Sequence, residues 1–310
     1  MSAPVSLKKL LGLFPSWLIN RRLRAGISNE HVRQLVRFAN EHPNWLGLVD
    51  DHVSVQTNFG FSIYCDRHSG IGQTLLADGQ WEGLLSRTIL ACLKPGETAM
   101  DIGANIGYDT LLMSQAVGPT GMVLAFEPVV AHFTLLLKNI RHVSADHVIA
   151  QNLALSNESV LSKIALSTAY NSGMPNLRPG ATGPTQAVMA TRLDSLLRAD
   201  QVPHIAFVKI DIEGFEFKAL QGMGGLIDSV DHLSCEVNTH FLAQCGSSAE
   251  DLFSYMGQHG FTSFCAAPYS DGKWTTGNHQ FQNTTAQGPH FDALFCRHVG
   301  NALQPLIQSS

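Results

Sequence analysis

The chain has few charged residues and no cysteine pattern of the kind that binds zinc. Charged residues make up only 15% of its 310 residues, against 45% hydrophobic ones, and this balance excludes an intrinsically disordered protein. The six cysteines are scattered without a C-x-x-C pair, so no structural zinc site is indicated. A net charge of −5 gives no overall electrostatic reason to bind nucleic acid, and we expect no such partner.

The chain also lacks an apolar run long enough to cross a bilayer. Residues 7–24 are basic and apolar, but they are too short and too charged to span, and they lack the cleavage site of a signal peptide. We favour a helix packed on the main domain or on the partner subunit of a homo-oligomer over an amphipathic helix on a membrane surface. Cysteines within apolar runs indicate buried free thiols, which suit the reducing cytoplasm.

Internal repeats and low-complexity linkers are absent as well, so the length predicts one large α/β domain with additions. Residues 1–80 are expected to form a helical and hairpin cap beside the ligand site, with a turn at 58–60. We assign residues 81–300 to the main domain and 301–310 to a frayed tail.

A glycine-spaced turn follows the first predicted core strand, at residues 98–102. The turn reads Asp101-x-Gly103-x-Asn105-x-Gly107, which differs from the G-x-G-x-x-G of dinucleotide-binding proteins. A second apolar strand ends in Glu127, at the right distance to accept hydrogen bonds from both hydroxyls of a ribose. The pattern favours a nucleotide without a pyrophosphate and with a charged amino-acid tail, as in S-adenosylmethionine.

Two further segments are predicted to border the ligand. Asn152 ends the third predicted strand, where a polar side chain would approach an adenine ring, although a plain turn asparagine explains it equally well. Residues 157–187 interrupt the alternation of strands and helices, and we interpret them as a hairpin insertion that flanks the substrate.

Five blocks of sequence, in the same order, resemble the FkbM family of methyltransferases. They are DIGANIGY at 101–108, AFEP at 125–128, ALS at 154–156, TRLD at 191–194 and VKIDIEG at 208–214. The resemblance implies an S-adenosylmethionine-dependent enzyme that usually methylates a hydroxyl of a sugar, glycan or small natural product. We therefore expect a Rossmann-like class I methyltransferase fold, with a seven-stranded, mostly parallel sheet that ends in an antiparallel hairpin.

In this interpretation, both ends of the methyl donor have assigned residues. The turn residues Gly103, Ala104, Asn105 and Gly107 approach the methionine tail together with Asp101. Glu127 binds the ribose, and Asp211 lies near the reacting methyl group. Asp101, Glu127 and Asp211 all follow or end strands, and ligands of open α/β sheets bind at the carboxyl ends of the strands.

The reaction needs alignment of the acceptor and removal of its hydroxyl proton by a base or a metal. Asp211 is the first candidate for the base or a metal ligand, with Glu236 as its partner, and His240 is a second candidate base. Lys209 and Glu213 suit either an orienting role or a structural ion pair. Magnesium could bind such carboxylates, but nothing in their spacing requires it.

Two other functional classes fit parts of the pattern. A nicotinamide-dependent oxidoreductase uses a related fold, but this sequence lacks the third glycine of the G-x-G-x-x-G motif at the required spacing. A non-catalytic adapter could keep the fold and bind a membrane or a partner through residues 7–24. Such an adapter has no need to keep four carboxylates, at residues 101, 127, 211 and 236, along one edge.

Overall fold

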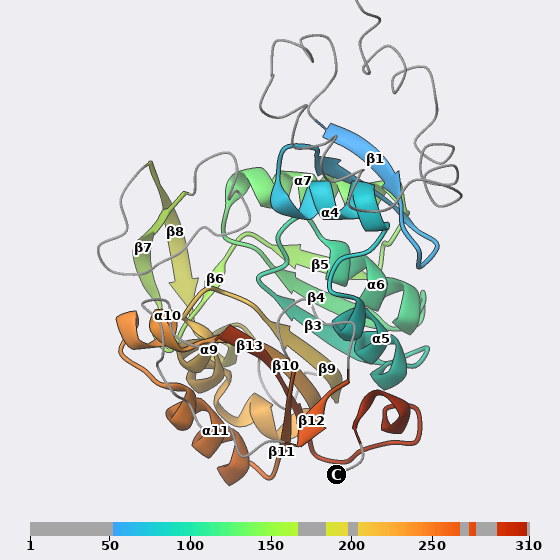
Figure 1. Ribbon diagram of the computed structural model, residues 1–310. Helices are drawn as coiled ribbons and strands as arrows, with labels where there is room; N and C mark the ends of the chain where they lie inside the picture. Colours follow the sequence, from blue (N-terminus) through green and yellow to red (C-terminus); the bar gives the residue numbers. More distant parts are fainter. Residues whose placement is uncertain (1–51, 167–183, 198–203, 267–272, 277–289, 309–310) are drawn as a thin grey trace, which may run out of the picture. The chain divides into compact units, whose positions relative to one another are not determined.

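The computed structural model describes residues 52–166, 184–197, 204–266, 273–276 and 290–308 (Figure 1). The helix expected at 7–24 lies outside these ranges. By their contacts, the described residues divide into two compact units at the boundary between Trp81 and Glu82. None of the described helices is long and apolar enough to pass through a membrane.

The second unit is built on one central sheet. Its strands follow the order β5-β4-β3-β9-β10-β13-β11-β12, and the first five of these are parallel while the last three alternate in direction. The strands are β3 (Thr98–Ile102), β4 (Met122–Phe126), β5 (Val148–Gln151), β9 (Ile205–Ile210), β10 (Val230–Asn238), β11 (Thr262–Ala266), β12 (Thr275–Thr276) and β13 (His290–Cys296). Seven full strands and the two-residue β12 confirm the predicted Rossmann-like class I fold with its antiparallel end.

The centre of this sheet is apolar on both faces. Every residue of β3 and β9 is buried, as expected of parallel strands that are covered by helices. Figure 1 shows α5 and α6 together on one side of the sheet and α9 and α11 on the other. The helices of this unit are α5 (Gly83–Cys92), α6 (Tyr108–Val117), α7 (Val130–His142), α8 (Leu193–Leu196), α9 (Glu216–Met223), η3 (Gly224–Ser229), α10 (Thr239–Gln244), α11 (Ala249–Gln258) and η4 (Gln304–Leu306).

A small sheet of three strands interrupts this arrangement. β7 (Val160–Ala165) pairs antiparallel with β8 (Thr185–Thr191), and β6 (Ala154–Leu155) pairs parallel with β8. The predicted hairpin insertion is therefore present as β7 and β8. Residues 167–183, which join the two strands, lie outside the described ranges, and a role beside the substrate remains a prediction.

The described part of the first unit is a hairpin followed by a helix. β1 (His52–Gln56) and β2 (Ser62–Asp66) pair antiparallel around the turn expected at 58–60. The helix α4 (Gly70–Asp78) was not predicted, although its end signals are in the sequence. The Oγ of Ser69 accepts a hydrogen bond from the N–H of Gly72, and Gly79 closes the helix in the left-handed conformation.

The predicted frayed tail is instead held against the domain as far as the structure describes it. Leu303 is buried, and the N–H of Gln308 donates to the carbonyl of Trp274. Trp274 is itself buried, and its indole N–H donates to the Oγ1 of Thr88 in α5 at 2.8 Å. The physical reason for the correction is therefore the tryptophan, which anchors the end of the chain.

Candidate active site

The glycine turn after β3 is fixed by close backbone contacts. Gly103 has a φ of +86°, and a Cβ added there would lie 1.9 Å from the carbonyl oxygen of Asp211. The N–H groups of Gly103 and Ala104 both donate to the carbonyl of Phe126, at 2.9 and 3.0 Å. The turn thus joins the ends of β3, β4 and β9, and only glycine fits its first position.

The rest of the turn also uses the left-handed region. Asn105 has a φ of +49° and Gly107 a φ of +96°. A Cβ on Gly107 would lie 2.5 Å from the Cδ1 of Leu136 in α7. The left-handed backbone and the contact of Gly107 with α7 therefore fix the shape of the turn.

Glu127 ties this turn to the end of β4. Its Oε2 accepts a hydrogen bond from the N–H of Asn105, and its Oε1 accepts one from the N–H of Val129, both at 2.8 Å. The amide of Asn152 donates to the carbonyls of Glu127 and Pro128. Each carboxylate oxygen has a second lone pair, so Glu127 can still accept from the hydroxyls of a ribose.

At the sheet edge where the parallel strands end, the ammonium of Lys209 lies among three carboxylates. Its Nζ lies 3.6 Å from Asp101 Oδ1, 3.4 Å from Asp109 Oδ2 and 3.6 Å from Asp211 Oδ2, and its side chain is only 7% exposed. It also donates to the carbonyl of Gly103. Burial alone would lower the pKa of Lys209, but these carboxylates outweigh burial and hold the pKa well above its ordinary value.

The buried carboxylates beside Lys209 are only partly satisfied. Asp101 is fully buried, and its Oδ2 accepts from the Oγ1 of Thr110 at 2.5 Å. Among the described residues, Asp101 Oδ1 and Asp109 Oδ1 have no hydrogen-bond partner. Burial, countered by Lys209, raises the pKa of Asp109 to about 6. Both oxygens are buried, so the positive charge that faces these two carboxylates is that of Lys209.

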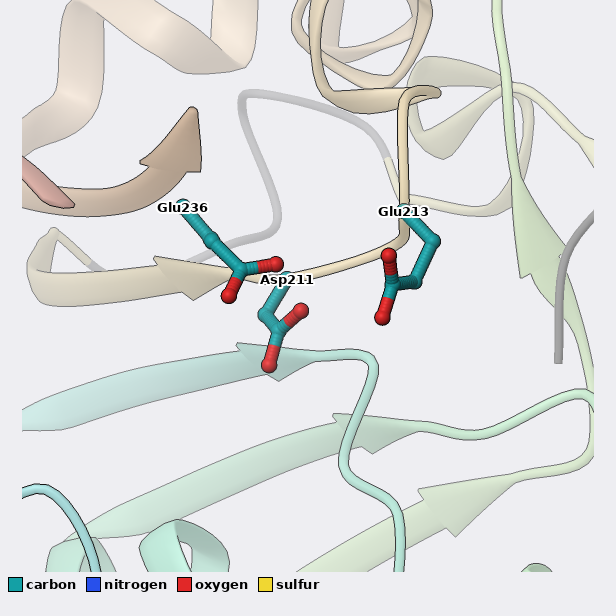
Figure 2. Close-up of side chains that lie close together, drawn as sticks. All are labelled: Asp211, Glu213 and Glu236. Atoms are coloured by element: carbon teal, nitrogen blue, oxygen red, sulfur yellow. The ribbon is translucent and has the colours of Figure 1, made fainter. Parts of the chain in front are cut away.

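Two further carboxylates, Glu213 after β9 and Glu236 on β10, converge on Asp211. Figure 2 shows Asp211 between Glu213 and Glu236, with the three carboxyl groups turned toward one another, and one oxygen of each lies within 4.8 Å of the others. The backbone of Glu213 is left-handed, with a φ of +57°. Glu216 supports this turn, because its Oε1 accepts from the N–H groups of Ile212 and Gly214.

These three carboxylates fit a magnesium ion poorly. Such a cation takes oxygen ligands, but nitrogen atoms already lie against two of the three side chains. Lys209 Nζ is 3.6 Å from Asp211 Oδ2, and His290 Nε2 is 2.8 Å from Glu236 Oε1. The ammonium supplies positive charge to Asp211 and the imidazole supplies a hydrogen-bond partner to Glu236, so these two side chains already have the partners that a metal would replace.

The structure adds acidic groups that the sequence did not single out. Asp292 lies opposite Glu236 in the register of β13 and β10. Burial, followed by repulsion from Asp211, raises the pKa of Glu236 well above its ordinary value. Burial and Asp292 do the same to the pKa of Glu82. The edge therefore carries more negative charge than Lys209 neutralises.

We predict that Asp292→Asn stabilises the protein at neutral pH. Burial and Asp211 raise the pKa of Asp292 from 3.8 to about 7. Between these values the folded state holds a proton that the unfolded state has lost, so the stability falls as the pH rises through this window. Removing the charge is expected to add about 1 kcal/mol at pH 8, or roughly 2–4 °C in Tm.

Thermal melts of Asp292→Asn and the parent at pH 8 and pH 4 measure this effect. At pH 4 the folded carboxyl is protonated and the unfolded one is only about half ionised, so most of the gain should disappear. A gain of the same size at both pH values would contradict the electrostatic explanation.

The structure brings together most, but not all, of the predicted site residues. Asp101 and Asp211 meet through Lys209, and Glu236 joins Asp211 directly. His240 lies instead at the start of α10, with its Nε2 3.0 Å from the amide nitrogen of Gln244 on the same helix. The imidazole that contacts Glu236 belongs to His290, a residue that the sequence interpretation placed at the end of a loop.

Comparisons with known proteins agree with this architecture. The family model described as "Methyltransferase FkbM domain" matches residues 101–263. The hexuronic acid methyltransferase AglP of Haloferax volcanii is 26% identical over 152 residues, which cover 49% of this chain and 60% of that relative. The chain thus spans less than two thirds of the length of this curated relative.

Two solved structures illustrate the similarity in fold. A putative O-methyltransferase from Klebsiella pneumoniae has a TM-score of 0.40 at 14% identity, over 91% of this chain and 96% of that one. TYW2 from M. jannaschii, solved in complex with AdoMet, also has a TM-score of 0.40 at 14% identity, over 81% of this chain and 88% of that one.

Proposed function

Because the chain belongs to the FkbM methyltransferase family, we propose that it transfers a methyl group from S-adenosylmethionine to a hydroxyl of a sugar, glycan or small natural product. The observation that carries the proposal is that one sheet edge holds both halves of such a site. The glycine turn and Glu127 lie at the ends of β3 and β4, and Asp211 and Glu236 lie on the neighbouring strands.

The residues of the turn fit the proposed methyl donor. The backbone from Gly103 to Gly107 would take the methionine part, and Asp101, buried behind the turn with Lys209, would hold that backbone in place. Glu127 would bind the ribose, and Asn152 would lie toward the adenine. When bound, the donor supplies a methyl group that is already activated on a sulfonium, so the protein mainly aligns the acceptor.

The charge in the acceptor half of the site, around Asp211 and Glu236, indicates the class of acceptor. AglP, by its name, acts on a hexuronic acid, which carries a carboxylate. In this chain Asp211, Glu236 and Asp292 would repel such an acceptor, and Lys209 is already paired with three carboxylates. Neutral hydroxylated acceptors are therefore expected to react better than hexuronates.

The proposal is tested with labelled methyl donor and a panel of acceptors. The panel holds neutral methyl glycosides, the matched hexuronates and simple phenols, and the product is identified by mass and by the position of the methyl group. Transfer to an oxygen of a neutral glycoside is expected. Transfer only to hexuronates, or to none of these hydroxylated compounds, would contradict the assignment.

Glu127→Ala is expected to weaken binding of S-adenosylhomocysteine by about 30- to 300-fold, since it removes the acceptor of both ribose hydroxyls and two backbone hydrogen bonds. Glu127→Gln is the matched control, because it keeps one carbonyl oxygen and the shape of the side chain. Its loss should be intermediate. Unchanged dissociation constants for both variants, measured by calorimetry, would contradict the placement of the ribose.

The thiols suit the cytoplasm, where we propose that the protein works. All six cysteines are free and buried in the structure. Proteins of oxidising compartments commonly use such residues in disulfides, whereas reducing compartments keep them as thiols.

A further inference from the structure

One histidine stands at the edge of the sheet where the carboxylates converge. His290 is the first residue of β13 and pairs in register with Asn238, the last residue of β10. Because β10 and β13 are antiparallel, the start of β13 lies at the carboxyl end of β10. His290 therefore shares this edge with Glu236 and Asp211.

The imidazole of His290 is held by a carboxylate and remains accessible. Its Nε2 lies 2.8 Å from Glu236 Oε1. The side chain of His290 is 34% exposed, whereas that of Glu236 is 15% exposed. A carboxylate on one ring nitrogen fixes the ring and its tautomer, and this leaves the other nitrogen available for proton transfer.

The other candidates for the base are less well placed. Asp211 lies 3.6 Å from the ammonium of Lys209, so its carboxylate is already engaged in an ion pair. His240 has its Nε2 beside Gln244 and its ring against Phe241, both on its own helix. Among the residues described at this edge, two imidazoles lie against a carboxylate. His132 Nδ1 lies 3.7 Å from Glu127 Oε1 at the end of β4, whereas His290 lies 2.8 Å from Glu236, beside Asp211.

We propose that His290 is the base that takes the proton from the acceptor hydroxyl, with Glu236 as the positioning residue that holds its ring; this rests on the proposed function. With a hydrogen on Nε2 shared with Glu236, the Nδ1 lone pair accepts the hydroxyl proton. The acceptor oxygen bonds to the methyl carbon while the carbon–sulfur bond breaks, and S-adenosylhomocysteine leaves. The imidazolium then returns its proton to water.

The surroundings of His290 favour a neutral ring that becomes charged during the reaction. Burial lowers its pKa, and Asp211 partly offsets this shift. The groups that face it are Glu236 on β10, Asp211 after β9 and Asp292 on its own strand. His290 and Glu236 titrate as a pair, so the rate of methyl transfer should rise as the pH rises through the apparent pKa of that pair.

The test compares His290→Asn and Glu236→Gln with the full-length parent. His290→Asn should lower kcat by about 10²- to 10⁴-fold and remove the rise of kcat with pH. Glu236→Gln should lower kcat by about tenfold and shift the midpoint of the pH profile. Neither should change the dissociation constant of S-adenosylhomocysteine by more than about threefold, because neither residue holds the donor.

A matched control is available in a second histidine–carboxylate pair. His204 Nε2 lies 2.6 Å from Asp231 Oδ2, before β9 and away from the carboxyl ends of the strands. His204→Asn should leave kcat and its pH profile unchanged. If His290→Asn does not fold, His290→Gln is used, and partial rescue of either variant by added imidazole supports the base.

The outcomes separate this proposal from the proposed function. If the parent neither binds S-adenosylhomocysteine nor transfers methyl groups, the proposed function itself fails. If the parent is active and His290→Asn keeps kcat within threefold with the same pH profile, the assignment of His290 is overturned. Loss of the pH dependence in His240→Asn instead would also overturn it.

Discussion

Lys209→Met is expected to lower the free energy of unfolding by about 3–5 kcal/mol at pH 8, because it leaves buried carboxylates without their shared cation. Asp101 and Asp109 are almost fully buried, and the ammonium lies within 3.6 Å of both. Methionine keeps most of the volume of lysine, so the loss reports charge more than packing. The loss should shrink at pH 5, where the uncompensated carboxyls take up protons.

Denaturant unfolding at the two pH values measures this effect. Lys163→Met, at an exposed position of β7, is the control and should change stability by less than about 0.5 kcal/mol. Combining Lys209→Met with Asp101→Asn should recover part of the loss, since one of the stranded charges is removed. A loss that is equal at pH 5 and pH 8, with no recovery in the double variant, would argue for packing instead of charge.

Gly103→Ala is expected to weaken binding of S-adenosylhomocysteine by at least about 100-fold. The added Cβ would lie 1.9 Å from the carbonyl oxygen of Asp211, so backbone must move on one side of the site. The φ of +86° adds strain of about 1–2 kcal/mol for any residue with a Cβ. Displacing Asp211 moves the proposed donor and acceptor halves apart, so kcat should fall as well.

Gly118→Ala is the control that separates backbone strain from the steric clash with Asp211. Gly118 also has a positive φ, +63°, but no atom lies within 4 Å of an added Cβ. This variant should lose about 1 kcal/mol of stability and keep its affinity for S-adenosylhomocysteine. Equal losses of affinity in both variants would show that the close approach to Asp211 is not what matters.

The sequence predicts the features of the site that depend on neighbours along the chain. An apolar strand, a glycine turn and a helix follow one another from Thr98 to Val117, and the periodicity of each is local. The carboxylates that end β4 and β9 are likewise placed by the rule that parallel strands end at one edge. Those parts of the prediction agree with the structure.

Residues that meet through strand pairing could not be found in this way. His290 lies 54 positions after Glu236, and their contact depends on the register of β10 with β13. A slip of β13 by one residue would turn His290 to the other face of the sheet, away from Glu236, and no local pattern fixes the register. The sequence therefore indicates His240, which is close to Glu236 along the chain, and gives no sign of His290.

The sequence singles out Lys209 for an orienting role or an ion pair, but it does not place Lys209 at the centre of a charge cluster. Lys209 is flanked by apolar residues on an otherwise buried strand, and its partners come from β3, α6 and the segment after β9. A lone lysine in a sequence does not reveal whether three carboxylates surround it. The register of Asp101 with Lys209 supplies that information.

Calorimetric titration of the full-length protein with S-adenosylhomocysteine, and separately with NADH, tests the central claim most directly. The glycine turn and Glu127 predict a micromolar dissociation constant for S-adenosylhomocysteine and no heat of binding with NADH. Binding of NADH alone, or of neither compound, would contradict the claim that this sheet edge holds the donor of a methyl-transfer reaction.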